Sequence, residues 1–519
     1  MKPTRYLLEG FQRMEDTMLY PWDDYAARMA QTDFLEGNME APAVKSFFVR
    51  NAPFGGSYML FGGLTEFLRQ LNGYRFSDEV CEGLLRQGYR KEWIRYLAEK
   101  SRLRVAVRSH CEGSIFLPNE PPITVSGSLH DMRLVEGMIY RAINPGTLWL
   151  TKWHRIVEAA KPSVVADFGM RRAQDANRST IYAYLAGCSS TSNSEINRWW
   201  DIPLVGTMGH EKVQSDGDEY LVFDNWLEYN PDRPVLLVDT INTLESGIPN
   251  AIKAFKKHWQ RIITAGGKPA VRLDSGDLAY LAMAAVKMLD EAGLQEVAIV
   301  ITNDIDEYVI ANIKTQIHEN SHRFALDGEY VLGRIASFPV GTKGATCFDQ
   351  PALGGVAKIM EIDGFASIKL TENNPEKTSI PGNNSSAFVF RGEELLGAVL
   401  FPVKTYQVKN GRFYKNGKAV SSMRVLHPHD GTRQYTIEWG DDIVNRQYAP
   451  YDGEWFTTEW ENPTLDTICE RIQKDISQLD WSHRRPVKSH EIKLSLVPEI
   501  YRLRQRMIRQ RALREDQLT

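Results

Sequence analysis

The chain has 519 residues, of which 43% are hydrophobic and 25% charged, with a formal net charge of −4 at pH 7. This length allows roughly two to four domains of about 150 residues, and the weak negative charge gives no field that would attract nucleic acid. The five cysteines are scattered without a C-x-x-C pair, which argues against a disulfide framework or a cysteine-based zinc site. No apolar signal segment and no run of the roughly 18 residues needed to span a membrane is present. We therefore expect a cytoplasmic protein that binds neither membrane nor nucleic acid.

The first 147 residues are predicted to form an N-terminal α+β domain. Helical periodicity and short alternating runs follow one another without an internal repeat, and a turn signal stands at Pro53-Phe54-Gly55-Gly56. Helices are predicted at 14–35, 63–71 and 77–88, and strands at 44–50, 105–107, 114–117 and 123–125.

Residues 148–370 have a different rhythm, which indicates an α/β domain. Short β-branched runs each end in a polar or glycine-containing cluster, and a helical stretch follows most of them. Six such units favour an α/β barrel or a doubly wound sheet, and in both folds the chemistry lies at the C-terminal ends of the strands. The strands are predicted at 163–168, 202–205, 234–238, 270–273, 297–301 and 335–340.

Residues 371–519 return to strands and helices and are predicted to rejoin the α+β domain. The aromatic and polar stretch 440–460 is interpreted as a surface insertion. The arginine-rich run 498–514 predicts a final helix, for which a solvated or subunit-facing position is favoured over nucleic-acid binding. A small sheet is expected from strands at 387–390, 396–401 and 406–408.

The most informative stretch is Val271-Arg272-Leu273-Asp274-Ser275-Gly276-Asp277-Leu278. Apolar residues lead into two aspartates three positions apart, and an amphipathic run, 278–292, follows at once. This pattern predicts a strand end, a polar turn and a helix N-terminus, where backbone N–H groups and the helix dipole favour phosphate. Asp274 and Asp277 can hold Mg²⁺ or sugar hydroxyls because carboxylate oxygens are hard acceptors. The alternative is that an aspartate or the serine only caps the helix.

Polar residues at other predicted strand ends point to related chemistry. His210 follows Gly206-Thr207 and could shuttle a proton or be phosphorylated as a nucleophile, although a single histidine can also be structural. Arg171 and Arg172 suit a carboxylate or phosphate, with a surface ion pair as the alternative. Asp239 adds a third carboxylate, so the set favours a ligand that carries anionic groups together with a metal or hydroxyls.

Two glycine-containing turns complete the candidate site. Ser275-Gly276 and Gly341-Thr342 suit close approach of the backbone to phosphate oxygens. No G-x-G-x-x-G, Walker A or G-x-S-x-G motif occurs, so the sequence does not indicate a dinucleotide fold, a P-loop or an α/β-hydrolase.

Several motifs resemble those of the nicotinate phosphoribosyltransferase family, in the same order and spacing. The N-terminal Asp23-Asp24-Tyr25 and Phe48-Val49-Arg50, and the downstream Pro351-Ala352-Leu353-Gly354-Gly355-Val356, extend the resemblance to roughly residues 20–385. The central motifs are Phe168-Gly169-Met170-Arg171-Arg172-Ala173-Gln174, Thr191-Ser192-Asn193, Gly206-Thr207-Met208-Gly209-His210, Arg272-Leu273-Asp274-Ser275-Gly276-Asp277-Leu278 and Gly341-Thr342.

The resemblance implies a type II phosphoribosyltransferase, an irregular α/β barrel packed against an α+β domain, in a homodimer with a shared active site. Members of the family join nicotinate to 5-phosphoribosyl 1-pyrophosphate, which gives nicotinate mononucleotide and pyrophosphate in NAD salvage. ATP hydrolysis drives the reaction through a phosphohistidine, and Mg²⁺ is required. The resemblance leaves the metal ligands unassigned.

Carried onto this chain, the roles known for the family fall mainly on the strand-end residues. His210 is implied as the phosphorylated residue and, with Asp274 and Asp277, as catalytic. Tyr25 is implied to stack on the pyridine ring, from the partner subunit. Arg171 and Thr207 are implied to bind nicotinate, and Arg272 an anionic group of the substrates. Asp239, with Asp274 and Asp277, is implied to serve ribose, Mg²⁺ and pyrophosphate. The remaining substrate-binding residues are Gly341 and Thr342 for the 5-phosphate, and Ser275 and Gly276 in the turn between Asp274 and Asp277.

The sequence departs from the family beside the histidine, where Gly209 and Glu211 replace the usual Ala and Ser. Two alternative functions remain, nicotinamide phosphoribosyltransferase and a non-catalytic ligand sensor on the same fold. Relatives that use nicotinamide tend to have an acidic residue where Ser192 and Asn193 stand, so this neutral pair favours nicotinate. The presence of His210 with both aspartates favours an enzyme over a sensor.

Overall fold

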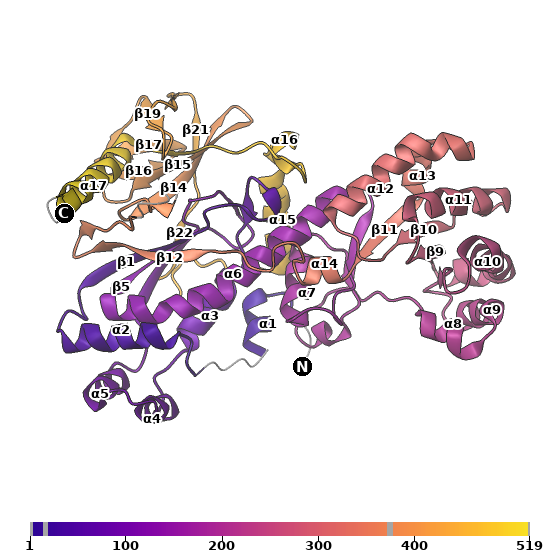
Figure 1. Ribbon diagram of the computed structural model, residues 1–519, viewed down its shortest axis with the longest axis horizontal. Coiled ribbons are helices and arrows are strands. Elements are labelled where there is room, and N and C mark those ends of the chain that lie inside the picture. Colours follow the sequence, from indigo (N-terminus) through magenta and orange to yellow (C-terminus); the bar gives the residue numbers. More distant parts are fainter. Residues whose placement is uncertain (1–3, 14–18, 371–376, 517–519) are drawn as a thin grey trace. The chain divides into compact units, whose positions relative to one another are not determined.

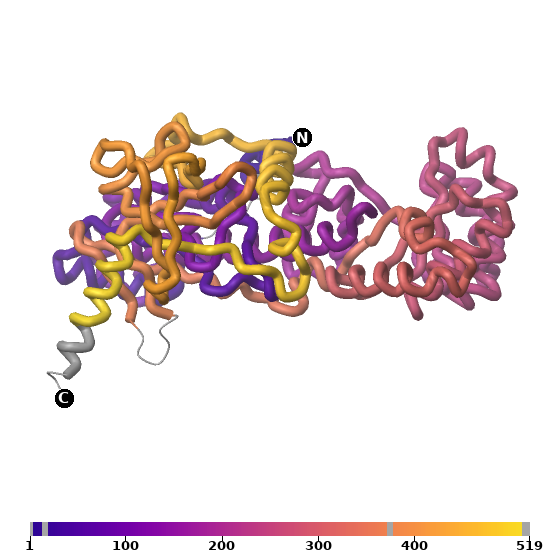
Figure 2. Tube along the Cα trace, turned by 90° about the horizontal axis from the view of Figure 1, so that it is seen from above, coloured from indigo at the N-terminus to yellow at the C-terminus, as the bar shows by residue number. Residues whose placement is uncertain are grey.

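The computed structural model describes residues 4–13, 19–370 and 377–516. The chain divides into two compact units, Thr151–Pro351 and the combination of Lys2–Leu150 with Ala352–Thr519 (Figures 1 and 2). This division differs from the three regions expected from the sequence. Residues 352–370 leave the α/β unit because β12 (Val356–Ile362) pairs antiparallel with β1 (Pro42–Phe48).

The unit Thr151–Pro351 is built on one six-stranded parallel sheet in the order β7-β6-β11-β10-β9-β8. The sheet is open, with β7 and β8 at its edges, so the α/β fold is confirmed and the irregular barrel is a partial one. Its strands are β6 (Val164–Asp167), β7 (Ser190–Thr191), β8 (Val235–Leu237), β9 (Ala270–Leu273), β10 (Ala298–Ile301) and β11 (Ile335–Val340).

Helices flank this sheet (Figure 1), and aspartate caps begin several of them. A side-chain carboxylate at the cap accepts a backbone N–H of the first turn, which would otherwise have no partner. Asp175, Asp218, Asp277, Asp306 and Asp327 do this for five helices. The helices are α7 (Ala176–Leu185), α8 (His210–Asp216), α9 (Glu219–Tyr229), α10 (Ile248–Thr264), α11 (Leu278–Glu291), α12 (Glu307–Asn320), α13 (Gly328–Arg334) and α14 (Thr342–Ala345), with short turns η2 (Ser194–Arg198), η3 (Thr243–Gly247) and η4 (Ser321–Phe324).

Five of the six predicted strands of this unit are present, and the sixth is replaced. The segment 202–205 makes only an isolated bridge between Leu204 and Thr191, next to Pro203, which has no N–H to donate. The edge strand β7 was not predicted, because a two-residue strand is too short to show a period of two.

The second unit contains two six-stranded sheets that mix N-terminal and C-terminal segments, as the interleaved indigo and orange traces in Figure 2 show. One sheet has the order β13-β12-β1-β5-β3-β22 and the other β20-β19-β23-β15-β14-β21. Their remaining strands are β3 (Val105–Ser109), β5 (Ile123–Ser128), β13 (Phe365–Ala366), β14 (Asn384–Arg391), β15 (Glu394–Pro402), β19 (Met423–Leu426), β20 (Gln434–Ile437), β21 (Asp442–Asn445), β22 (Tyr448–Tyr451) and β23 (Leu494–Leu496), and smaller sheets contain β2 (Met59–Leu60), β4 (Ile115–Phe116), β16 (Tyr406–Lys409), β17 (Arg412–Lys415) and β18 (Lys418–Ala419).

The stretch 440–460 is not a surface insertion. Its strand β21 pairs with β14, and β22 pairs with β3, so both sheets of the unit contain it. The aromatic character that suggested an insertion comes partly from Tyr451, which is buried against the unit.

The longest helix, α6 (Leu129–Ala160), was not predicted. Pro145 and Gly146 interrupt its sequence and are typical of a helix end, yet the 32-residue helix continues through them. The predicted helix at 14–35 is described from α2 (Asp24–Leu35), and residues 14–18 lie outside the described part of the chain. The other helices of this unit are α1 (Leu7–Arg13), α3 (Leu64–Gly73), α4 (Asp78–Arg86), α5 (Lys91–Lys100), α15 (Leu465–Ser477), α16 (Trp481–Arg484) and α17 (Pro498–Asp516), with the turn η1 (Pro53–Gly55).

The arginine-rich final helix is confirmed as α17, but one of its arginines is not solvated. Arg504 is buried and donates to the carbonyl of Pro428. None of the described helices is both long enough and apolar enough to cross a membrane.

Candidate active site

The structure brings His210 together with two of the predicted aspartates at the carboxyl edge of the parallel sheet. Its Nε2 lies 3.5 Å from Oδ2 of Asp274 and 4.0 Å from Oδ1 of Asp239. Its Nδ1 lies 3.0 Å from the hydroxyl of Thr240. The imidazole is held from β8 and faces β9, while 39% of its side-chain surface stays exposed. An exposed imidazole with one nitrogen anchored and the other beside carboxylates can exchange a proton or accept a phosphoryl group.

Asp239 is almost completely buried, with 1% of its side chain exposed. Oδ2 accepts the backbone N–H of Asp274 at 3.0 Å and the hydroxyl of Ser275 at 2.5 Å. Oδ1 is also buried but has no hydrogen-bond partner among the described residues. Buried polar atoms are normally paired, so an unpaired carboxylate oxygen beside His210 indicates a position that a cation or a ligand hydroxyl can fill.

Arg272 and Asp274 are locked together by a residue on the next strand. Arg272 Nη2 pairs with Oδ2 of Asp274 at 3.1 Å, and its Nε donates to the hydroxyl of Thr302 at 3.0 Å. The Thr302 hydroxyl in turn donates to Oδ1 of Asp274. The third nitrogen of Arg272, Nη1, donates to the hydroxyl of Thr207 at 2.8 Å. This hydrogen bond ties β9 to the loop that leads to His210.

Thr302 was not selected from the sequence as a site residue. It directly follows β10, in which the register pairs Val300 with Arg272 and Ile301 with Leu273. Continuation of that register puts Thr302 beside Asp274, where neighbouring side chains interact directly. The sequence contains this threonine at a strand end but not the strand order, so the pairing could not be derived before the sheet was known.

Asp277 stands apart from this cluster. It is exposed, and its Oδ1 accepts the backbone N–H of Tyr280 at 3.1 Å as the cap of α11. The cap that was considered as an alternative is therefore present. Gly276, in the turn between the two aspartates, has a φ of +77°, which glycine adopts without strain.

The turn Gly341-Thr342 follows β11 and lies against the end of β6. A Cβ on Gly341 would lie 3.1 Å from the carbonyl oxygen of Phe168, and one on Gly169 would lie 2.4 Å from the side chain of Ala345. The two glycines therefore allow the backbones of adjacent strand-end turns to approach closely. The N–H of Gly169 is bonded to Asp167, so an anion at these turns would be bound by the backbone at Gly341 and Thr342.

Two other predicted residues do not contact the His210 cluster. Arg171 is exposed in the turn after β6, and within the described residues its side chain makes no hydrogen bond or ion pair. Tyr25 belongs to the other unit, on α2, with 52% of the residue exposed. Its hydroxyl donates to Oε1 of Glu136 at 3.1 Å, and burial together with this carboxylate raises the pKa of Tyr25 to about 12.

Comparison with known proteins identifies the family. The chain is 36% identical over 511 residues to the nicotinate phosphoribosyltransferase of Bacillus subtilis (strain 168), and the match covers 95% of each chain. The chain belongs to the nicotinate phosphoribosyltransferase family. A sequence model of the N-terminal domain of this family matches residues 22–144. The nicotinate phosphoribosyltransferase of Dictyostelium discoideum is 28% identical, over 92% of this chain and 86% of its own length.

Solved structures share the fold of the nicotinate phosphoribosyltransferase family with this chain. Human nicotinic acid phosphoribosyltransferase has a TM-score of 0.72 at 22% identity, covering 93% of this chain and 99% of the human one. Nicotinate-nucleotide pyrophosphorylase from Pyrococcus furiosus has a TM-score of 0.64 at 18% identity, covering 88% and 95%. At these identities the likeness establishes the fold alone.

A buried carboxylate, Asp167, shapes the family motif after β6 and was missed in the sequence. Its Oδ1 accepts the N–H of Gly169 at 2.8 Å, and Oδ2 accepts the hydroxyls of Thr180 at 2.6 Å and Thr191 at 2.9 Å. The pKa of Asp167 is raised, because the effect of burial outweighs that of the three hydrogen bonds, which lower it. Asp167 thereby fixes the start of the turn that presents Arg171, although it lies beneath the surface itself.

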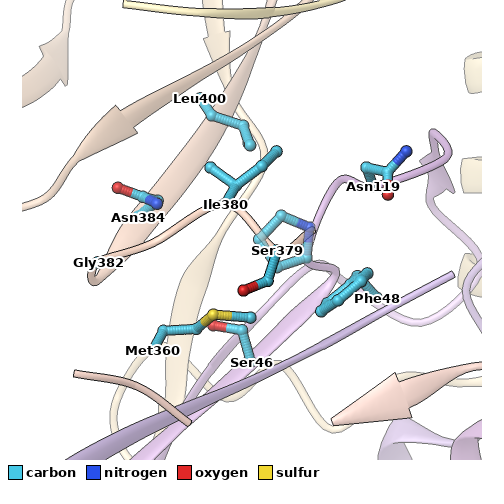
Figure 3. A pocket seen from close by; sticks show the side chains of 10 residues that line it. Ser46, Phe48, Asn119, Met360, Ser379, Ile380, Gly382, Asn384 and Leu400 are labelled. Carbon is cyan, nitrogen blue, oxygen red and sulfur yellow. The ribbon is translucent and has the colours of Figure 1, made fainter. Parts of the chain in front are cut away.

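The cavity in Figure 3 lies in the unit of Lys2–Leu150 and Ala352–Thr519 and is too small for a phosphorylated sugar. Phe48, Met360 and Leu400 line it together with small polar side chains such as Ser46 and Ser379, and no charged side chain lines it. Its volume of about 20 Å³ has room for roughly one or two water molecules. A phosphorylated sugar needs far more space and cationic partners.

Proposed function

We propose that the protein is a nicotinate phosphoribosyltransferase, which joins nicotinate to 5-phosphoribosyl 1-pyrophosphate and releases pyrophosphate. The observation that carries the proposal is the convergence of His210, Asp239, Arg272 and Asp274 at one sheet edge, in a chain of this family. The relative from Bacillus subtilis, which bears the name of this activity, matches 95% of the chain and 95% of its own length, which supports the proposal.

The acceptor base would be held by Arg171, Thr207 and Tyr25. An exposed guanidinium at the turn after β6 suits a carboxylate, and Tyr25 would stack on the pyridine ring from a partner subunit. Three of the five N–H groups of Arg272 are directed at Thr207, Thr302 and Asp274. One N–H on each terminal nitrogen remains for an anionic group of the substrates.

The reaction is a displacement at the anomeric carbon of the ribose. The lone pair of the pyridine nitrogen forms the new C–N bond while the C–O bond to pyrophosphate breaks, and pyrophosphate leaves with the electron pair. Positive charge develops on the ribose in the transition state, and the carboxylates of Asp239 and Asp274, which lie beside His210, would stabilise it. Gly341 and Thr342 would bind the 5-phosphate through backbone N–H groups, and Ser275 and Gly276 would contact the substrate phosphates from the opposite turn.

Mg²⁺ fits this edge as a partner of the substrate rather than as a resident ion. The described residues contain no group of three or more His, Cys, Asp or Glu side chains that could hold a metal by themselves. The unpaired Oδ1 of Asp239 and the second oxygen of exposed Asp277 are hard ligands, and Mg²⁺ commonly combines one or two carboxylates with substrate phosphates. When bound, the ion would neutralise charge on the departing pyrophosphate.

We also propose that ATP hydrolysis is coupled to the reaction through phosphorylation of His210. If the Nδ1–H of His210 donates a hydrogen bond to the hydroxyl of Thr240, Nε2 carries the lone pair. That lone pair would attack the γ-phosphorus of ATP, and ADP would leave. Asp239 and Asp274 would then balance the charge of the modified imidazole. The adjacent Glu211 is exposed and adds negative charge near the incoming phosphate, so Glu211→Ser should raise the rate of phosphorylation.

Nicotinate is favoured over nicotinamide by the residues near Asn193. Asn193 is buried, donates to Asn177 at 3.0 Å and accepts the N–H of Glu195, so it is part of the scaffold. The nearest acid, Glu195, is paired with Arg198 at 2.7 Å. No unpaired acid from this segment is therefore available to recognise an amide group.

A homodimer is proposed from the loops around the site. Four exposed apolar side chains follow strand ends or lie in the loops between them: Met170, Leu204, Ile241 and Phe348. Apolar side chains gathered at the rim of a polar site are typical of a surface that another subunit covers.

One assay separates the proposed function from its alternatives. Purified protein is incubated with labelled nicotinate or nicotinamide, 5-phosphoribosyl 1-pyrophosphate, Mg²⁺ and ATP, and the mononucleotide is measured. We expect nicotinate mononucleotide, and formation that is stimulated by ATP and lost in His210→Ala. Product from nicotinamide alone would indicate the related amide-using enzyme, and no product from either base would indicate a ligand sensor. Full ATP stimulation in His210→Ala would refute the phosphohistidine.

A further inference from the structure

Lys152, on the last part of α6, is completely buried between two carboxylates. Its Nζ lies 2.7 Å from Oε2 of Glu307 and 3.1 Å from Oδ2 of Asp349. Glu307 is buried as well, and its other oxygen accepts Nε of Arg155 at 3.0 Å. Two cations and two carboxylates thus share one site beneath the sheet edge, and none of them was selected from the sequence.

Stability alone does not account for this cluster. Taking ions out of water is costly, and a buried ion pair is often no more stable than an apolar replacement of the same size. Burial would lower the pKa of Lys152, but Glu307 and Asp349 raise it, so the amine stays charged in the interior. What an ion pair supplies that an apolar contact does not is a fixed direction between its partners.

The partners of Lys152 lie in two segments on either side of the turn Gly341-Thr342 in the chain, the turn proposed to bind the 5-phosphate. Glu307 begins α12, after β10, and Asp349 follows α14, after β11. Lys343, two residues beyond Gly341, forms a second link between the same turns, with Nζ 2.8 Å from Oδ2 of Asp306.

The next residue of α6 also contacts the α14 segment. The Cα of Gly344 lies so close to Trp153 that a Cβ there would be 2.5 Å from the indole ring. Trp153 is fully buried and its indole donates to the hydroxyl of Ser179 at 3.4 Å. The segment that starts at Gly341 is therefore held at residue 343 from α12, and at residues 344 and 349 from α6.

We propose that Lys152 is a positioning residue that fixes the turn Gly341-Thr342 in the geometry that binds the 5-phosphate of the phosphoribosyl substrate. This inference rests on the proposed function for its kinetic readout but not for its structural one. The amine touches no substrate and acts through Asp349 and Glu307. A small displacement of binding groups lowers the rate strongly even when the mutated residue is remote from the chemistry.

The test uses Lys152→Met in the full-length protein, with Lys161→Met as the matched control. Lys161 directly follows α6, is exposed, and pairs with Glu158. The methionine leaves Glu307 paired with Arg155 and leaves Asp349 able to reach water, so no isolated buried charge is created. Asp349→Ala is a second variant that keeps the Lys152–Glu307 pair, and it decides the matter if Lys152→Met does not fold.

Two measurements are made on each variant. Hydrogen–deuterium exchange of peptides from 341–350 should be about tenfold faster in Lys152→Met and Asp349→Ala than in the wild type or Lys161→Met. The KM for 5-phosphoribosyl 1-pyrophosphate should rise about tenfold in the same two variants, while the KM for nicotinate stays near its wild-type value.

The outcomes are distinct. Unchanged exchange in 341–350 would overturn the inference whatever the activity. An equal rise in both KM values would also overturn it, because it would indicate general damage to the site. A wild-type protein that makes no mononucleotide, together with faster exchange in the variants, would refute the proposed function and leave the positioning role intact.

Discussion

At the scale of single residues, the site is a chain of hydrogen bonds in which one hydroxyl joins the cation to the acid. Thr302 accepts from Arg272 and donates to Asp274, and it is 3% exposed. Without this hydroxyl both groups would lose a partner in a poorly hydrated place, and an unsatisfied buried group costs about 1–3 kcal/mol. The orientation of Asp274 toward His210 depends on that bond.

We therefore expect Thr302→Val to lower kcat/KM about 10- to 100-fold, the range that corresponds to a loss of this size. Thr302→Ser keeps the hydroxyl and should keep most of the activity. Steady-state kinetics with the pair of variants checks the prediction, and thermal unfolding checks that both are folded. Equal activity of the valine and serine variants would show that the hydroxyl has no role.

The two aspartates of the predicted pair should differ in their contributions. Asp274 contacts His210 and Arg272, whereas Asp277 is exposed and caps α11. We expect Asp274→Asn to lower kcat by about 10²–10³, as for loss of one charge-assisted contact in a transition state. Asp277→Asn keeps a capping side chain and removes one exposed carboxylate oxygen, whose place at a bound Mg²⁺ water can take, so a loss of about tenfold or less is expected. A larger loss for Asp277→Asn than for Asp274→Asn would contradict this ranking.

Much of the site could be predicted from the sequence, because strand ends of a parallel sheet meet at one edge whatever their order. His210, Asp239 and Asp274 were found in this way and do lie together. Thr302 and Lys152 were not found, because their partners are on other strands or helices and no spacing in the chain records those contacts. Register and helix packing have to be known before such residues can be assigned.

At the scale of elements, α3 begins on a buried carboxylate from another segment. Glu112 accepts the N–H of Gly63 at 2.6 Å and the N–H of Thr65 at 2.7 Å. Burial raises the pKa of Glu112 to about 7, although these hydrogen bonds lower it. The folded protein consequently binds a proton on Glu112 at a pH where the unfolded chain has released it.

This linkage has a definite sign. The stabilisation from protonated Glu112 is complete below the unfolded pKa near 4.5 and is lost as the pH rises through about 7, a change of roughly 3 kcal/mol at most. We expect the difference in melting temperature, Glu112→Gln minus wild type, to become more positive between pH 5 and pH 8, because only the wild type loses this stabilisation. Thermal unfolding of both proteins across this range is the measurement, with Glu82→Gln, at an exposed position of α4, as control. A constant difference would mean that Glu112 does not titrate in the folded state.

Secondary structure was predicted correctly where a short run of residues carries a clear hydrophobic pattern. Strands β6, β9, β10 and β11 are mostly apolar and lead into polar turns, which is typical of buried parallel strands. Helix α6 was missed because Pro145 and Gly146 resemble a helix end, and packing along its whole length outweighs their local preference. Local signals therefore identified the strand ends, while tertiary contacts determined the longest helix.

At the scale of the whole molecule, a shared active site makes a prediction about mixtures of subunits. Tyr25 is in a different unit of the chain from His210, and we propose that it serves the site of a partner. Tyr25→Ala and His210→Ala should each be inactive alone. A randomly paired population of the two variants should recover about one quarter of wild-type activity, because half of its dimers are mixed and each mixed dimer has one intact site of two.

Co-expression with two different affinity tags allows the mixed dimers to be purified and assayed. Light scattering gives the oligomeric state of each sample. Absence of recovery in purified mixed dimers would show that each chain supplies its own Tyr25, and a monomer in solution would refute the shared site altogether.

The antiparallel pairing of β1 with β12 has a consequence for synthesis on the ribosome. About 300 residues separate the two strands, so at about 5–20 residues per second β1, whose other neighbour β5 is made much sooner, waits roughly 15–60 s for β12. The parallel sheet of Thr151–Pro351 has all its strands by residue 340, well before β22 has been translated. The middle of the polypeptide can thus reach its native packing first, and the sheet that contains β1 is completed only later, by β12, β13 and β22.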